Sequence, residues 1–188
     1  MRVTREQAEE NRRAVVEAAG KLFRERGFDG VGLAELMGSV GLTQGGFYKQ
    51  FKSKDELAVE ACDRALEKGA DAWRRAAATA GTNAYAALVE RYLTMRHRAR
   101  VGEGCVFAAL AGDAARHGPE LPRHVEAGMK TYVGILADAM PDADPDAALA
   151  AFSTMVGALL LARAVDDDAY ARRILDAATA RLLGRTPA

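Results

Sequence analysis

The sequence of 188 residues is poor in proline, aromatic residues and cysteine. Only five prolines are present, and three of them, Pro119, Pro141 and Pro145, fall where helices are expected to connect. Aromatic residues make up 6% of the chain, whereas alanine and leucine dominate. Because this composition favours helix and no segment shows a strand pattern, we predict an all-α fold.

The few cysteines and histidines exclude several kinds of site. Cys62 and Cys105 lack the Cys-x-x-Cys spacing of a zinc site and are too few for a disulfide framework. The histidines, His97, His117 and His124, show no metal-ligand spacing. We therefore predict no metal and no cofactor, and we expect the histidines at the surface or in a supporting role.

The motifs of common enzymes are missing as well. The sequence has no Ser–His–Asp order, paired-carboxylate motif, phosphate-binding loop or HExxH motif, and Cys105 is its candidate nucleophile. We therefore predict that the chain is not an enzyme. A small all-helical enzyme remains the alternative from another functional class.

The distribution of apolar and charged residues favours a cytoplasmic protein. The N-terminus is polar and lacks an apolar leader. Residues 147–165 are long enough to span a bilayer, but they include Arg163 and stand alone, so we expect a buried helix and no membrane. Net charge is zero, yet residues 1–54 carry ten basic and seven acidic side chains, which permits an anionic partner.

Helical periodicity divides the chain into about nine helices. Ser53 followed by Glu56 forms a capping-box pattern, and Asp144 with Pro145 marks another helix start. The expected helices are 4–27, 33–40, 43–50, 53–78, 84–100, 105–116, one from after Pro122 to Met140, 146–165 and 168–183. We predict an N-terminal three-helix unit at 1–52, followed by a bridging helix and a helical bundle at 53–188.

The second and third expected helices form a helix-turn-helix pattern around Gly41. The second helix of this motif enters the major groove of DNA. Gly45 and Gly46 at its start would let the backbone approach phosphates, and the start of the next helix, with Lys52 and Lys54, also favours a phosphate. The alternative is that the two glycines form a loop and the lysines a solvated surface.

The run LMGSVGLTQGGFYKQFKSKDEL, which follows KLFRERGFDGVG, resembles the DNA-binding region of the tetracycline-repressor (TetR) family. The matching residues are Gly41, Leu42, Thr43, Gly45, Phe47, Tyr48, Phe51, Ser53, Lys54 and Leu57. The resemblance implies a repressor that binds a pseudo-palindromic operator in double-stranded DNA as a homodimer and leaves it when a small-molecule effector binds. It implies DNA contacts at Thr43, Gln44, Gly45, Gly46, Tyr48, Lys49 and Lys54.

The same resemblance places Phe47 and Phe51 in the core and shows two departures from the family pattern. Gly32 stands where a capping Ser or Thr is frequent, and Ala34 stands where an Arg often contacts phosphate. Glycine is a tolerable cap. The missing Arg removes one phosphate contact, so we expect a shallower salt dependence of DNA binding.

In this family the C-terminal domain binds the effector and dimerises. The last two expected helices are rich in leucine and are expected to pack against a second copy as a four-helix interface, although they could simply be core. The effector pocket is expected between the helices of 84–140 and 146–165. Its predicted lining is Tyr92, Met95, Cys105, Phe107, Met129, Tyr132, Phe152 and Met155, for each of which core packing is the alternative.

Cys105 supports a second hypothesis of the same fold, a thiol-based sensor of electrophiles or oxidants. The cysteine opens an expected helix, and Arg98 and Arg100 lie close in sequence. A helix start and nearby cations lower a thiol pKa, so this hypothesis requires a partly exposed Cys105 with a lowered pKa. The alternative is a small buried side chain.

Overall fold

The computed structural model describes residues 4–185, and within them the chain forms helices and no strand, which confirms the predicted all-α class. The helices are α1 (Arg5–Arg26), α2 (Leu33–Ser39), α3 (Lys54–Ala80), α4 (Ala84–Tyr92), α5 (Met95–Ala99), α6 (Val106–Ala114), α7 (Glu120–Ala139), α8 (Pro145–Ala164) and α9 (Asp168–Leu182). Three short 3-10 helices connect them, η1 (Gln44–Lys49), η2 (Gly81–Asn83) and η3 (Val101–Glu103).

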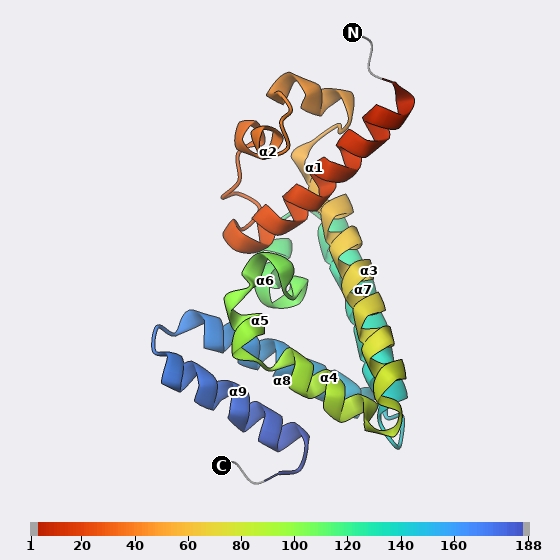
Figure 1. Cartoon of the computed structure of the whole chain (residues 1–188), viewed down its shortest axis with the longest axis vertical. Coiled ribbons are helices and arrows are strands. Elements are labelled where there is room, and N and C mark those ends of the chain that lie inside the picture. The colour runs from red at the N-terminus through yellow and green to blue at the C-terminus, as the bar shows by residue number, and fades with distance from the viewer. Residues whose placement is uncertain (1–3, 186–188) are drawn as a thin grey trace.

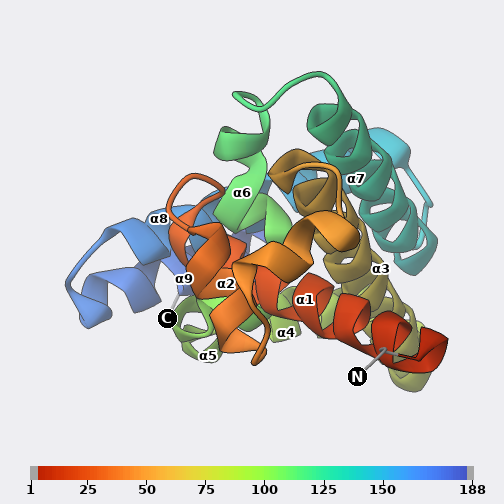
Figure 2. The same cartoon turned by 90° about the horizontal axis from the view of Figure 1, so that it is seen from above.

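The helices form two groups that share the long helix α3 (Figure 1). One end of the molecule holds α1, α2 and η1, and the other end holds α4, α8 and α9. Helices α3 and α7 run side by side, and α6 lies directly below the N-terminal group (Figures 1 and 2). The buried side chains form one continuous core, so the two groups are not separated by a linker. The division at residue 52 stays a prediction, and its outer bounds, 1 and 188, lie outside the described residues.

The predicted helix starts at Ser53 and Asp144 are confirmed. The Ser53 hydroxyl accepts a hydrogen bond from the Glu56 amide at 3.0 Å, while the Glu56 carboxylate accepts one from the Lys52 amide at 2.7 Å. Asp144 accepts bonds from the first amides of α8, and Pro145 occupies the first helical position, where an N–H is not needed. These caps fix where α3 and α8 begin.

Three of the predicted helices differ from the structure in their bounds or in their type. The single helix expected at 84–100 is broken, because Thr94 is extended and its hydroxyl caps a new helix by accepting from the His97 amide at 3.1 Å. The segment expected as a helix at 43–50 is the 3-10 helix η1, and the Thr43 side chain makes no capping bond. Helix α7 begins at Glu120, before Pro122, because a proline in the first turn removes no intrahelical hydrogen bond.

Candidate functional site

The turn between α2 and η1 depends on Gly41. Gly41 has φ of +72°, a conformation that side chains rarely adopt, and the Leu42 amide returns to the Met37 carbonyl at 2.9 Å. This turn starts η1 so that Phe47 is fully buried while Tyr48 is 66% exposed. Phe47 stacks on the buried Phe51 with ring centroids 5.4 Å apart, which confirms the core positions expected for both.

The two glycines of η1 are not required by the fold. A Cβ atom at Gly45 would meet no atom within 4 Å, and one at Gly46 would make an ordinary contact with Met37 at 3.7 Å. Neither glycine has a positive φ. Glycine is less favourable than alanine in a helical segment, so the fold itself gives no reason for glycine at either position.

The polar residues predicted to contact DNA lie along η1 and the start of α3. Tyr48 and Lys49 are exposed, as are Thr43 and Gln44 just before them, and Lys54 is half-buried at the first position of α3. Two arginines of this unit are paired, Arg12 with Glu60 and Arg26 with Glu35, whereas Lys49 and Lys54 form no ion pair within residues 4–185. Free ammonium groups beside a helix start can bind phosphate.

Arg12 holds this surface in place, a role that the sequence reasoning missed. Its guanidinium lies 4.2 Å from the centre of the Phe51 ring and donates to the Gln50 carbonyl and the Glu60 carboxylate. The contacts join α1 to the end of η1 and to α3. In the sequence, Arg12 stands out only as a basic residue one helical turn before the buried Val15 and Val16, which is a weak signal for such a contact.

The predicted effector-binding residues form the core of the C-terminal bundle. Tyr92, Phe107, Tyr132, Phe152 and Met155 are all buried, whereas Met95, Cys105 and Met129 are half-buried and pack at the margin. The rings meet edge to face, with Phe107 and Phe152 centroids 5.1 Å apart. Trp73 of α3 completes this cluster and lies 4.9 Å from the Tyr132 ring, a contact that the sequence reasoning missed.

A surface groove of about 400 Å³ adjoins this cluster between α3 and α7. Tyr132 and Leu66 are among its lining residues, and the Tyr132 hydroxyl donates to the Leu66 carbonyl at 3.2 Å. Two further lining residues, His124 and Asp63, form a pair in which Nδ1 of His124 lies 2.8 Å from a carboxylate oxygen of Asp63. The groove is lined by charged side chains, among them Glu67 and Arg74, as well as by the apolar side chains of Leu66 and Ala70.

Cys105 does not have the electrostatic environment that a sensor requires. It directly precedes α6 without a side-chain capping bond, and its amide donates to His97 Nε2 at 3.1 Å. Burial raises the pKa of its thiol, and the neighbouring Tyr92 hydroxyl, two helix amides and the charge of Arg163 only oppose that shift. The predicted lowered pKa is wrong, because desolvation outweighs the helix start.

Helices α8 and α9 carry an exposed apolar surface. Leu160 and Leu161 of α8 are 48% and 55% exposed, Leu149 is 43% exposed, and Tyr170 of α9 is 51% exposed. Helix α8 is long and apolar enough to cross a membrane by length and composition, but it packs against α7 and α9. Part of its apolar surface therefore stays exposed.

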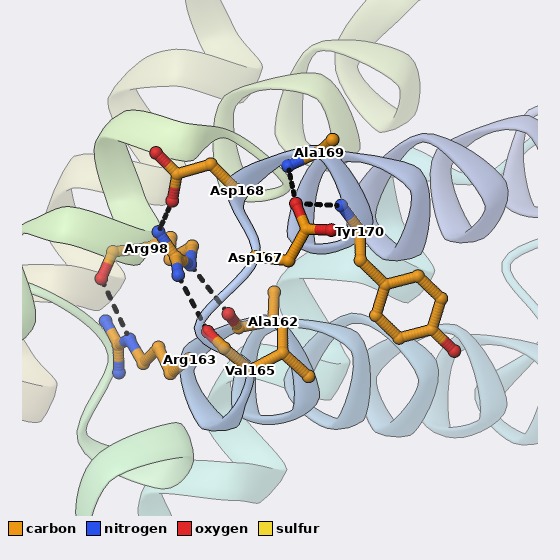
Figure 3. Close-up of polar contacts among 8 residues, drawn as sticks. All are labelled: Arg98, Ala162, Arg163, Val165, Asp167, Asp168, Ala169 and Tyr170. Carbon is orange, nitrogen blue, oxygen red and sulfur yellow. Dashed lines mark hydrogen bonds and ion pairs between the residues drawn. The ribbon is translucent and has the colours of Figure 1, made fainter.

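Arg98 fixes the connection between these two helices (Figure 3). Its guanidinium donates to the carbonyls of Ala162 and Val165 at 2.6 and 2.9 Å and pairs with Asp168 at 2.6 Å. Asp167 caps α9 by accepting from the two following amides. Helices α8 and α9 are thereby held as an antiparallel pair.

Comparison with known proteins relates the N-terminal unit to a family of regulators. The model of the bacterial regulatory proteins, tetR family, matches residues 15–61. The HTH-type transcriptional regulator AcrR of Shigella flexneri is 34% identical over 59 residues. That match covers 31% of this chain and 27% of the length of AcrR.

Solved structures resemble almost the whole chain. A TetR transcriptional regulator from Chloroflexus aurantiacus has a TM-score of 0.78 and 26% identity, and the match covers 95% of both chains. E. coli NemR in its reduced form has a TM-score of 0.79 and 18% identity over 95% of this chain and 98% of its own. AibR, in complex with isovaleryl coenzyme A and operator DNA, has a TM-score of 0.64 and 17% identity over 94% of this chain and 100% of its own.

Proposed function

We propose that this chain, a transcriptional regulator of the TetR family, represses transcription by binding operator DNA as a homodimer and releasing it when a small-molecule effector binds. The proposal places the chain in the cytoplasm and gives it no catalytic step. Residues Thr43, Gln44, Gly45, Gly46, Tyr48 and Lys49 would enter the major groove, and Lys54 would contact a phosphate.

The observation that carries the DNA-binding proposal is the pair of glycines in η1. Both occupy positions where the chain itself would accept alanine. They stand beside the exposed Tyr48 and the unpaired Lys49. A backbone that must lie against phosphates or base edges explains why no side chain is present there.

The exposed leucines of α8 and Tyr170 of α9 support dimerisation through the last two helices. Two such helices from each chain would bury these side chains in a four-helix interface. The two-fold axis of that dimer would place two η1 segments on one side of a DNA duplex. The operator would accordingly be a pseudo-palindrome.

A route from the bundle to the DNA-binding unit passes through η3 and α1. Arg24 of α1 donates to the Gly102 carbonyl at 2.9 Å, and a Cβ at Gly102 would come within 2.8 Å of Lys21 in the same helix. The turn that precedes Cys105 and α6 therefore packs directly on α1. An effector that moves η3 would tilt α1 and change the distance between the two η1 segments.

The test is to select genomic DNA fragments with purified protein and sequence them. We expect enrichment of an imperfect inverted repeat, and we expect loss of that enrichment with Tyr48→Ala combined with Lys49→Ala. A folded wild-type protein that enriches no sequence would refute the proposal. Circular dichroism provides the control that the variant is folded.

A further inference from the structure

Arg12 of α1 contacts the end of η1 and the start of α3, the two segments that are proposed to bind DNA. Its guanidinium donates to the backbone carbonyl of Gln50, the residue at which η1 ends, and to the carboxylate of Glu60 in α3. A second carboxylate of α3, that of Glu56, lies 3.9 Å from the same guanidinium. One side chain of α1 therefore joins the end of η1 to the first two turns of α3.

The end of η1 depends on a contact from outside the helix. The Gln50 and Phe51 amides both donate to the Phe47 carbonyl, at 2.8 and 3.0 Å. A 3-10 helix has poorer hydrogen-bond geometry than an α-helix, and the carbonyls at a helix end lack partners within the helix. The Gln50 carbonyl receives its hydrogen bond from Arg12.

The Arg12 guanidinium also covers an aromatic ring of the core. It lies over the Phe51 ring, 4.2 Å from the ring centre, and this buried ring stacks on Phe47 of η1. A planar guanidinium can stack on a ring and donate hydrogen bonds in several fixed directions at once, whereas an ammonium group is a point charge. The position of η1 therefore depends on an arginine at this place.

Arg12 has no free positive charge to offer to DNA. Its two terminal nitrogens already donate, one to the Gln50 carbonyl and the other to the Glu60 carboxylate. The carboxylates of Glu56 and Glu60 together carry more charge than the single guanidinium they face. A phosphate that approached this group would meet a net negative charge, so the role of Arg12 differs from that proposed for Lys54.

We propose that Arg12 is a positioning residue for operator recognition, and that it sets the position of η1 relative to the start of α3. This inference rests on the proposed function and adds a residue that determines sequence selectivity without touching DNA. Base contacts from η1 would specify the sequence, while the phosphate contact of Lys54 would fix the register of the protein on the duplex. Both kinds of contact are made together only when η1 and Lys54 keep one relative position.

A displaced η1 should lose base contacts before the phosphate contact is lost. Hydrogen bonds to base edges require donors and acceptors in fixed directions. The ammonium group of Lys54, on a flexible stem, can bind a phosphate oxygen from several directions. Loss of Arg12 should therefore reduce selectivity for the operator and leave binding to random DNA in place.

The experiment compares wild type with Arg12→Met, which keeps an apolar stem and removes the charge and the donors. Fluorescence anisotropy is measured on the selected operator and on random DNA at several salt concentrations, with circular dichroism as the control for folding. Operator affinity should fall about tenfold, as for the loss of a base contact. Affinity for random DNA and the slope of log K against log salt should stay as in wild type, because no phosphate contact is lost. Equal losses on both DNAs with a shallower slope would identify Arg12 as a phosphate contact and overturn the proposal.

The conservative variant Arg12→Lys tests whether charge alone is sufficient. Its ammonium group can still pair with Glu60, but it cannot also stack on Phe51 and donate to the Gln50 carbonyl in the same geometry. Selectivity for the operator over random DNA should therefore stay below that of wild type. Wild-type selectivity in Arg12→Lys would contradict the bridging geometry.

Arg26 of the same helix provides the matched control. Its guanidinium pairs with Glu35 of α2, so Arg26→Met removes an ion pair between two helices of the same unit and leaves the contacts of Arg12 in place. The ratio of operator affinity to random-DNA affinity should stay as in wild type. An equal loss of selectivity in Arg12→Met and Arg26→Met would indicate a general loosening of the unit and overturn the specific role of Arg12.

Hydrogen exchange without DNA examines the positioning contact by itself. The Gln50 and Phe51 amides should exchange at least about fivefold faster in Arg12→Met, whereas amides of α9, at the other end of the molecule, should exchange as in wild type (Figure 1). Unchanged exchange at Gln50 and Phe51 would overturn the inference. A wild-type chain that enriches no DNA refutes the proposed function and this inference with it, whereas an operator-binding chain whose selectivity survives Arg12→Met overturns the inference alone.

Discussion

Gly45 occupies a helical position at which a methyl group would meet only open space. We predict that Gly45→Ala leaves the fold intact and raises the free energy of unfolding by up to about 1 kcal/mol, because alanine restricts the unfolded chain. Operator affinity should fall at least about tenfold, since the added Cβ holds η1 away from the duplex. Urea unfolding and fluorescence anisotropy on the selected operator measure the two quantities.

Gly112 of α6 offers the matched control. A Cβ there would also meet no atom within 4 Å, but the residue lies outside the DNA-binding unit. Gly112→Ala should therefore give a similar gain in stability with unchanged operator affinity. If Gly45→Ala bound the operator as tightly as Gly112→Ala, the steric explanation of the glycine pair would be wrong.

Lys54 and Tyr48 should contribute to DNA binding in different ways. Lys54→Ala should weaken binding to all sequences similarly and reduce the slope of log K against log salt by about one, because one phosphate contact is lost. Tyr48→Ala should change the preferred sequence or register and leave the salt slope unchanged. Titrations at several salt concentrations on operator and random DNA separate the effects, and equal slopes for wild type and Lys54→Ala would count against the phosphate contact.

Cys62 makes a prediction about alkaline stability. Burial raises the pKa of this thiol from its ordinary value near 9 to about 12. Between these values the unfolded thiol is ionised while the folded thiol keeps its proton, so its contribution to stability is lost as pH rises. The free energy of unfolding should fall by up to about 1.4 kcal/mol per pH unit from this group.

The Cys62→Ala variant isolates that contribution. Stability is measured by urea unfolding at pH 8, 9, 10 and 11. Wild type should lose its advantage over the variant progressively above pH 9, whereas other buried groups affect both proteins alike. A constant difference between the two proteins across this range would show that the thiol ionises equally in the folded and unfolded states.

At the scale of the helices, the packing of α3 against α7 depends on Gly128. A Cβ at this residue would lie 2.7 Å from a terminal methyl group of the buried Leu66. We predict that Gly128→Ala lowers the free energy of unfolding by about 1–3 kcal/mol through overpacking. Gly134→Ala on the same helix, where a Cβ would meet no atom within 4 Å, should be neutral or stabilising. Equal stability of the two variants would contradict close packing at Gly128.

The sequence predicted the helices well where the boundaries depend on local chemistry. The caps at Ser53 and Asp144 and the turn at Gly41 involve residues within five positions of each other, so their pattern is visible in the sequence. The break at Thr94 also has a local cap, but the apolar periodicity on both sides hid it. Capping by a threonine competes with helix continuation, and only the tertiary packing decides between them.

The contacts of Arg163 could not be predicted from the sequence, because they depend on burial and join distant segments. Arg163 is visible in the sequence only as one charge in an apolar run, and its contacts with the segment around His97 span 66 positions. The thiol of Cys105 likewise depends on desolvation, which the sequence does not show. The DNA-contacting residues were easier to predict, since they are consecutive.

At the scale of the whole molecule, the dimer determines what kind of operator can be read. Burial of Leu160 and Leu161 against a second copy would remove an exposed apolar surface from water and fix the spacing of the two η1 segments. Half-site centres should then lie somewhat more than one helical turn, about 34–36 Å, apart. Leu161→Glu should give a folded monomer that no longer protects the operator.

A hydroxyl-radical footprint of the wild-type protein on a selected operator tests the dimeric DNA-binding account most directly. We predict two protected blocks of similar length on the same face of the duplex, related by the symmetry of the inverted repeat. Leu161→Glu should lose both blocks together, and sedimentation should show it as a monomer. A single block, or the same footprint from a monomeric protein, would contradict the account.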